Sequence, residues 1–100
     1  EAVTDYLRQW QLGDVANVRV KDLTSHKLAQ LGIALAFVGE PDAVVVDDVE
    51  SQLTMSQSEA LVDLLLDAAR TRNVAVVVGV VERDLAAMAD ATVYLSKDGE

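Results

Sequence analysis

The first forty residues show apolar side chains at helical spacing in two stretches. Residues 2–11 place Val3, Tyr6, Leu7 and Trp10 on one side of a helix, and Gly13 supplies a stop. A second stripe consists of Leu28, Leu31, Ala34, Leu35 and Val38. Thr24 or Ser25 can cap the start of this second helix, while Gly39 and Pro41 end it. The pattern predicts two helices joined by a short polar link over residues 14–22.

After Pro41 the pattern changes to valine-rich runs separated by helical segments. Ala43–Val46 is a continuous apolar run, as is Val74–Val81, and such runs are typical of parallel strands buried on both faces. Between them, Ser56 and Glu59 form a capping box that predicts a helix to about Arg72. The stripe of this helix consists of Leu61, Leu65, Ala68 and Ala69, with Val62 and Leu66 beside it.

The last twenty residues predict one more helix and one more strand. The helix covers residues 83–89, and the strand covers Thr92–Leu95. Lys97–Gly99 has the composition of a hairpin turn.

Strands and helices that alternate with short connections form right-handed βαβ units. We therefore expect an α/β fold, with a partial parallel sheet of about three strands and flanking helices, preceded by an all-helical segment. The predicted division places residues 1–40 in the helical part and residues 41–100 in the α/β core.

Charge and composition exclude several functions. The net charge is −9 and the eight basic residues are scattered, so the chain lacks the clustered Lys and Arg of a nucleic-acid surface. No apolar run approaches the ~20 residues of a membrane span, which predicts no direct membrane insertion. Without cysteine, the chain can form neither disulfides nor a thiolate metal site, which suits a cytoplasmic protein.

The chemistry suggested by the residues themselves lies at Asp47 and Asp48. Both directly follow the first apolar strand, and the carboxyl end of a strand is where open α/β sheets place their ligands. Two adjacent carboxylates repel each other and are stabilised by a cation such as hydrated Mg²⁺. The alternative is that one Asp caps a turn while the other is simply exposed.

A family resemblance extends this interpretation. From Leu23, the sequence LTSHKLAQLGIALAFVGEPDAVVVDDVESQLT resembles, without gaps over 32 positions, the ATP-binding-cassette (ABC) pattern that runs from the LSGGQ signature to the D-loop. Further on, ADATVYL from Ala89, with Gly99, is similar to a later segment of the same family. The resemblance covers almost the whole chain and implies the second half of a P-loop ATPase core.

The resemblance implies roles for ten residues. Asp47 would hold Mg²⁺ through water, and Asp48 stands at the position of the general base. Four residues of the signature would contact nucleotide bound by an opposite subunit: Thr24, Ser25, His26 and Lys27. Four more would form the D-loop: Ser51, Gln52, Leu53 and Thr54.

The same resemblance implies ATP and Mg²⁺ as cofactors of the full-length protein. It also implies two partners, a second cassette in a homo- or heterodimer and a membrane permease. The protein would then lie in the cytoplasm, peripheral to the inner face of the cell membrane.

Several positions depart from the family pattern. The base is Asp48 instead of Glu, which shortens its reach by roughly 1 Å, and displacements of that order can cost about 10²-fold in rate. Ser25 and His26 replace the two signature glycines, and Thr54 replaces the D-loop Asp. Glu50 adds a charge beside the acidic pair, and no His follows Val74–Val81 to sense the γ-phosphate.

The phosphate-binding loop G-x-x-x-x-G-K-[ST] does not occur in these 100 residues. We therefore expect weakened or absent hydrolysis in the complete protein, and an inactive fragment.

A second hypothesis is a non-enzymatic α/β interaction module, similar to the antagonist domains of anti-sigma-factor regulation. In that case Ser56 or Ser58 would be a regulatory phosphosite at a helix start. A response-regulator receiver fits poorly, because it has its acidic pair on the first strand with another Asp and a Lys on later strands, and that order is missing here.

Overall fold

The computed structural model describes residues 2–50 and 52–93, which form a small α/β fold. The helices are α1 (Ala2–Gln9), α2 (Ser25–Ala36), α3 (Met55–Arg72) and α4 (Arg83–Ala86). The strands are β1 (Ala43–Val46) and β2 (Ala75–Val78), which pair in parallel with Val44 opposite Val76. Two single-turn 3₁₀ helices, Gly13–Val15 and Val20–Asp22, connect α1 to α2.

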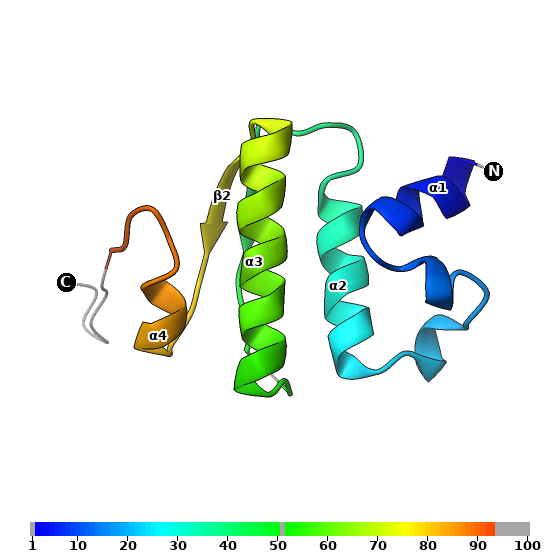
Figure 1. The fold of residues 1–100 in the computed structure, drawn as a ribbon, viewed down its shortest axis with the longest axis horizontal. Coiled ribbons are helices and arrows are strands. Elements are labelled where there is room, and N and C mark those ends of the chain that lie inside the picture. Colours follow the sequence, from blue (N-terminus) through cyan, green and yellow to red (C-terminus); the bar gives the residue numbers. More distant parts are fainter. Residues whose placement is uncertain (1, 51, 94–100) are drawn as a thin grey trace.

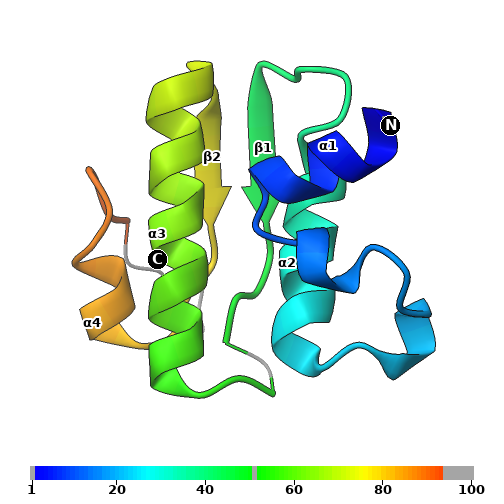
Figure 2. The ribbon, with the colours of Figure 1, turned by 45° about the vertical axis from the view of Figure 1, so that its right-hand side comes forward.

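α2 and α3 stand side by side, and both run against the direction of the strands (Figures 1 and 2). In Figure 1, α3 lies across the front of the sheet. The carboxyl ends of both strands and the first turns of both long helices therefore meet at one end of the molecule. This end carries the candidate site.

The two strands are covered on one face only, which corrects the prediction that they are buried on both. Val44 is buried in the core, whereas Val45 and Val77 are 74% and 61% exposed. The alternation follows from the strand period of two, since α2 and α3 lie against a single face. The opposite face of the described sheet is open and apolar.

The predicted third strand is absent from the described residues. Thr92 and Val93 lie outside any strand, and the Thr92 hydroxyl donates to the carbonyl of Ala86 (3.1 Å). Tyr94 and Leu95 fall outside the described residues, as does the turn predicted at 97–99. The sheet of the described chain thus has two strands rather than about three.

The face through which α2 packs overlaps its predicted stripe only in part, at Ala34, which is buried, and at Leu31, which packs against the core. Its buried side chains are Gln30, Ile33 and Ala34, whereas Leu28 and Leu35 are exposed. Ile33 and Ala34 belong to the same core as residues of α3 and β1. Because α2 is apolar over more than half of its circumference, the sequence pattern does not select the face that meets the core.

α3 confirms the predicted helix and its stripe, with Leu61, Leu65 and Ala68 buried. Its capping box, however, lies two residues earlier than predicted. Thr54 is the N-cap, its hydroxyl accepts from the Gln57 N–H (3.1 Å), and the Gln57 side chain accepts from the Thr54 N–H (3.1 Å). Ser56 therefore lies within the first turn of the helix.

The N-terminal helix joins the same core. Trp10 and Leu12 are buried together with Phe37 and Leu65. The chain turns sharply at Gln11, whose φ of 61° is left-handed, so α1 ends before the predicted stop at Gly13. None of the helices within residues 2–50 and 52–93 is long and apolar enough to cross a membrane.

Candidate functional site

The acidic pair lies where β1 ends, and both of its side chains are exposed. An Asp48 side-chain oxygen accepts a hydrogen bond from the backbone N–H of Glu50 (2.8 Å). Asp48 thus caps the turn of its own loop, as the alternative interpretation expected, while the side chain of Asp47 is exposed to solvent. The backbone just after β2 lies very close to the backbone of Asp47, since a Cβ on Gly79 would lie 2.5 Å from the Asp47 carbonyl oxygen.

Glu50 ties the loop after β1 to the loop after β2. Its carboxylate accepts from the backbone N–H groups of Val81 (2.5 Å) and Glu82 (3.3 Å), thirty-one and thirty-two residues further along the chain. The sequence pattern suggested only an added charge at Glu50. The family pattern has its γ-phosphate-sensing His just after this strand, and here the backbone of Val81 and Glu82 instead binds a carboxylate from the same chain.

Below this loop, the Ser58 hydroxyl donates to the Val49 carbonyl (3.1 Å), and both residues are buried. Ser58 is therefore a structural hydrogen-bond donor, and of the two candidate phosphosites only Ser56 is exposed.

The signature segment begins α2, and its polar side chains contact two different parts of the chain. Thr24 is the N-cap, as predicted, and its hydroxyl accepts from the Lys27 N–H (3.2 Å). The Ser25 hydroxyl donates to the Gln52 side chain (3.3 Å), which brings the signature and the D-loop segment together. The Lys27 ammonium turns away toward the Gln11 carbonyl (3.4 Å) and Asp14 (3.7 Å).

The D-loop segment leads directly into α3. Ser51 lies outside the described residues, Gln52 is exposed with a φ of 61°, and Leu53 is half-buried. Thr54, where the family pattern has Asp, caps α3 through its hydroxyl. Like Asp, a hydroxyl side chain can cap a helix at this position, because both accept a hydrogen bond from a backbone N–H of the first turn.

No group of three or more His, Asp or Glu in the part of the chain that the structure describes is arranged to hold a metal ion. Magnesium in proteins commonly keeps several waters and uses only one or two carboxylates. The exposed carboxylate of Asp47 fits such a water-mediated contact, and Asp48 is partly engaged in its loop. The assignment of Mg²⁺ to Asp47 stays a prediction.

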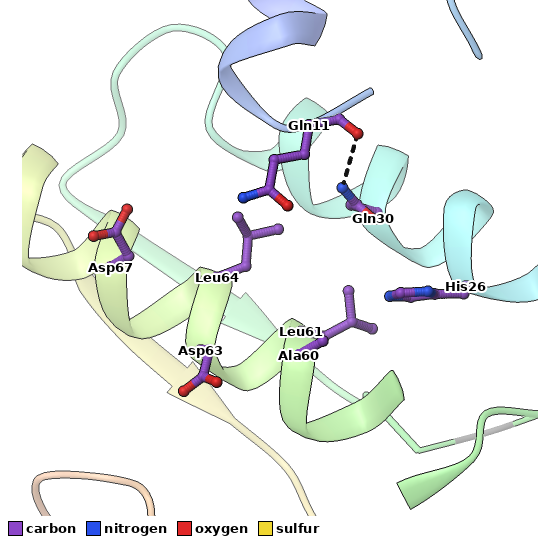
Figure 3. Close-up of a pocket in the computed structure, with 8 residues that line it drawn as sticks. All are labelled: Gln11, His26, Gln30, Ala60, Leu61, Asp63, Leu64 and Asp67. Carbon is purple, nitrogen blue, oxygen red and sulfur yellow. Dashed lines mark hydrogen bonds between the residues drawn. The ribbon is translucent and has the colours of Figure 1, made fainter. Parts of the chain in front are cut away.

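Two hollows beside α2 were not predicted from the sequence. The first, of about 320 Å³, lies between α2 and α3 and is drawn in Figure 3 with the eight residues that line it, His26 among them. The second, of about 270 Å³, runs between the small residues Ala29, Gly32 and Ala36 of α2 and the stretch Val45–Val49. The sequence alone could not predict which residues line these hollows, because that depends on which face of α2 packs against the rest of the chain.

Fold and site together define a small α/β unit with a parallel β-α-β arrangement and an acidic loop at the carboxyl end of its sheet. No protein-family model, curated protein or solved structure matches the chain.

Proposed function

We propose that this chain is the second half of an ABC-type ATP-binding protein, the nucleotide-binding component of a transporter, with weakened or absent ATP hydrolysis. The observation that carries the proposal is the contact between Ser25 and Gln52. These residues belong to two motifs of the proposed family, 27 residues apart, and they meet at the end of the molecule where β1 delivers Asp47 and Asp48.

The parallel pairing of β1 with β2 supports the same proposal. A strand that ends in acidic residues, beside a parallel neighbour and between two helices, is the geometry in which open α/β sheets bind ligands. ATP and Mg²⁺ would bind only in the complete protein, which also has to supply a phosphate-binding loop. A second cassette and a membrane permease are the partners proposed with it.

Weak hydrolysis follows from the local contacts of Asp48. Its carboxylate is one methylene shorter than that of Glu and accepts a hydrogen bond from its own loop, so it is poorly placed to polarise a water on a distant phosphate. Ser25 and His26 also carry Cβ atoms that hinder the close approach of a phosphate to the backbone of α2.

The test uses the complete protein, encoded with the reading frame upstream of Glu1. Asp48→Glu should raise ATP turnover about tenfold or more, because it restores the reach of the base. Steady-state phosphate release measures this rate. Asp84→Glu, the same extension at an exposed position on α4, is the matched control and should change nothing.

If turnover stays unchanged in Asp48→Glu although the protein binds Mg·ATP, Asp48 does not stand at the base position. An upstream region without a phosphate-binding loop, together with no Mg·ATP binding, would overturn the nucleotide-binding proposal itself.

The second candidate function is a non-enzymatic interaction module. The open apolar sheet face around Val45 and Val77 favours it, because monomeric proteins rarely leave such faces uncovered. In this case a phosphate on Ser56, in the first turn of α3, would be the regulatory signal. A complete protein that binds no Mg·ATP would favour this candidate over the first.

A further inference from the structure

The edge of β1 that faces away from β2 carries unpaired backbone groups. The Asp42 carbonyl accepts from the N–H of Ala75 in β2 (3.1 Å), and the Val46 carbonyl accepts from the residue just after β2 (2.9 Å). A strand bonds to one neighbour through every second residue, so the backbone groups of Ala43 and Val45 point to the opposite edge. Within residues 2–50 and 52–93, β2 is the only strand that pairs with β1. Such an edge is a template on which another extended chain can add a strand.

Helix α2 offers an apolar surface along this edge. In Figure 2, β2, β1 and α2 follow one another from left to right. The hollow of about 270 Å³ lies between β1 and the small residues Ala29, Gly32 and Ala36 of α2. Leu28 and Leu35 lie one turn before and one turn after Gly32, and they are 46% and 62% exposed. We call these five residues of α2 the ledge.

An extended segment beside β1 fits the free edge and the ledge together. Its backbone can pair with Ala43 and Val45, while the side chains on one of its faces fill the hollow. Because strand side chains alternate between two faces, the segment needs an apolar residue at every second position. A docked helix would cover the ledge but leave the edge of β1 unpaired, since all of its backbone bonds are internal.

Carboxylates at the two ends of β1 select the charge of the segment. Asp42 and Asp47 are exposed, and neither belongs to an ion pair in the part of the chain that the structure describes. Their separation corresponds to roughly 16 Å of extended chain at about 3.3 Å per residue. Basic residues at a matching separation are attracted to both ends. A second copy is repelled, because antiparallel pairing of two β1 strands brings Asp42 of each copy close to Asp47 of the other.

We propose that the free edge of β1 and the ledge of α2 bind an extended segment of a partner protein. The segment is apolar at alternate positions and basic at both flanks, and it adds a third strand to the sheet. This inference rests on the second candidate function and names the kind of partner that such an interaction module recruits. The binding of Mg·ATP, which decides between the two candidate functions, is a separate measurement from the one that tests this partner.

The test titrates the 100-residue chain with the peptide acetyl-Lys-Val-Thr-Val-Thr-Lys-amide at low salt, by calorimetry. We expect saturable binding, and slower hydrogen exchange at the Val45 amide than in the free chain. Exchange at the Val46 amide should change little, because this residue already faces β2. A control peptide with Glu in place of both lysines should bind about tenfold more weakly or not at all, since its charges oppose those of Asp42 and Asp47.

Two pairs of variants locate the binding surface. Gly32→Phe fills the ledge and should weaken binding about tenfold or more, and it should fold because a Cβ at this position meets nothing within 4 Å. Its control, Ala60→Phe, places the same ring at an exposed position on α3 outside the ledge and should have less than about a twofold effect.

The second pair tests the charges. Asp42→Asn/Asp47→Asn should weaken binding about fivefold or more, whereas Asp63→Asn/Asp67→Asn removes the same charge from exposed positions on α3 and should change it less than about twofold. Circular dichroism establishes that all variants are folded. Equal effects within either pair, equal affinity for the Glu peptide, unchanged exchange at Val45, or no saturation would overturn the proposal.

Other occupants of this edge give distinct results. Dimerisation of the chain that the peptide reverses, followed by analytical ultracentrifugation, would assign the edge to a second copy. Binding of the peptide to the 100-residue chain but not to the complete protein would show that the rest of the same polypeptide covers the edge. Either result would overturn the assignment to a partner protein, whereas equal binding to both proteins supports it.

Discussion

At the scale of single residues, Gly79 and Gly32 differ in the space around them: one is closely packed and the other is open. A Cβ on Gly79 would lie 2.5 Å from the backbone oxygen of Asp47, which cannot move without displacing the acidic loop. A Cβ on Gly32, inside α2, would meet nothing within 4 Å. Gly79 thus allows the two strand ends to approach, while Gly32 only costs helix propensity.

Alanine substitutions should therefore act in opposite directions. Gly79→Ala should lower the free energy of unfolding by about 1–3 kcal/mol, since overpacking forces the backbone to shift. Gly32→Ala should raise it by up to about 1 kcal/mol, because alanine is the better helix former. Urea denaturation measures both. Equal effects of the two substitutions would show that the contact between Gly79 and Asp47 does not constrain the fold.

The candidate site was predictable from the sequence only as far as its contacts are local. Asp47 and Asp48 follow a valine run, so their place at the end of β1 could be predicted from the pattern alone. The bonds from Glu50 to Val81 and Glu82 span more than thirty residues and depend on the pairing of β1 with β2. No local pattern contains that information.

At the scale of elements, the start of α3 illustrates the same limit. Thr54 with Gln57 and Ser56 with Glu59 both match the capping-box pattern, and they are two residues apart. The structure uses the first pair. The buried Ser58 bonds to Val49, and this contact fits a helix that already begins at Met55. Tertiary contacts thus select one of two equivalent local solutions.

Thr54→Ala should lower the free energy of unfolding by about 1 kcal/mol, because one N–H in the first turn of α3 loses its acceptor. Ser56→Ala, at an exposed position in the same turn, serves as the control and should change it by less than about 0.5 kcal/mol. Thermal unfolding by circular dichroism compares the two. A larger loss in Ser56→Ala would place the cap where the sequence pattern first suggested it.

At the scale of the whole molecule, the sheet is apolar on both faces but packed on one. The valine runs predicted strands, and the strands are there, yet burial depends on what covers each face. Valine is favoured in strands whether or not both faces are covered, so its presence could not reveal that Val45 and Val77 are exposed.

Exchanging valine for threonine distinguishes the two faces. Val44→Thr should lower the free energy of unfolding by about 1–3 kcal/mol, since it buries a hydroxyl in the core. Val45→Thr should change it by less than about 0.5 kcal/mol in the 100-residue chain, because this side chain is 74% exposed. Urea titrations provide the comparison. A large loss in Val45→Thr would mean that this face of the sheet is covered in solution.

The predicted division at residue 40 raises the question of whether the helical segment and the α/β core unfold together or separately. Trp10 packs on Phe37 (ring centroids 4.9 Å apart) and lies beneath the Arg72 guanidinium (4.7 Å), while the Tyr6 hydroxyl donates to the Ala34 carbonyl (2.7 Å). Trp10 is also 2% exposed within the same core as Leu65. Contacts that join α1 to both α2 and α3 favour a single cooperative unit.

Trp10 is the only tryptophan and therefore reports directly on this joint. Its fluorescence and the far-UV circular dichroism should give the same urea midpoint, as a two-state transition requires. Arg72→Ala should alter the emission of Trp10 and lower the free energy of unfolding by about 0.5–1 kcal/mol, the usual worth of an exposed cation–π contact. Arg70→Ala, whose partner Asp90 is exposed, should do neither. Two separate midpoints would instead show that residues 1–40 unfold on their own, because the fluorescence of Trp10 would then change while the helices of the α/β core remain folded.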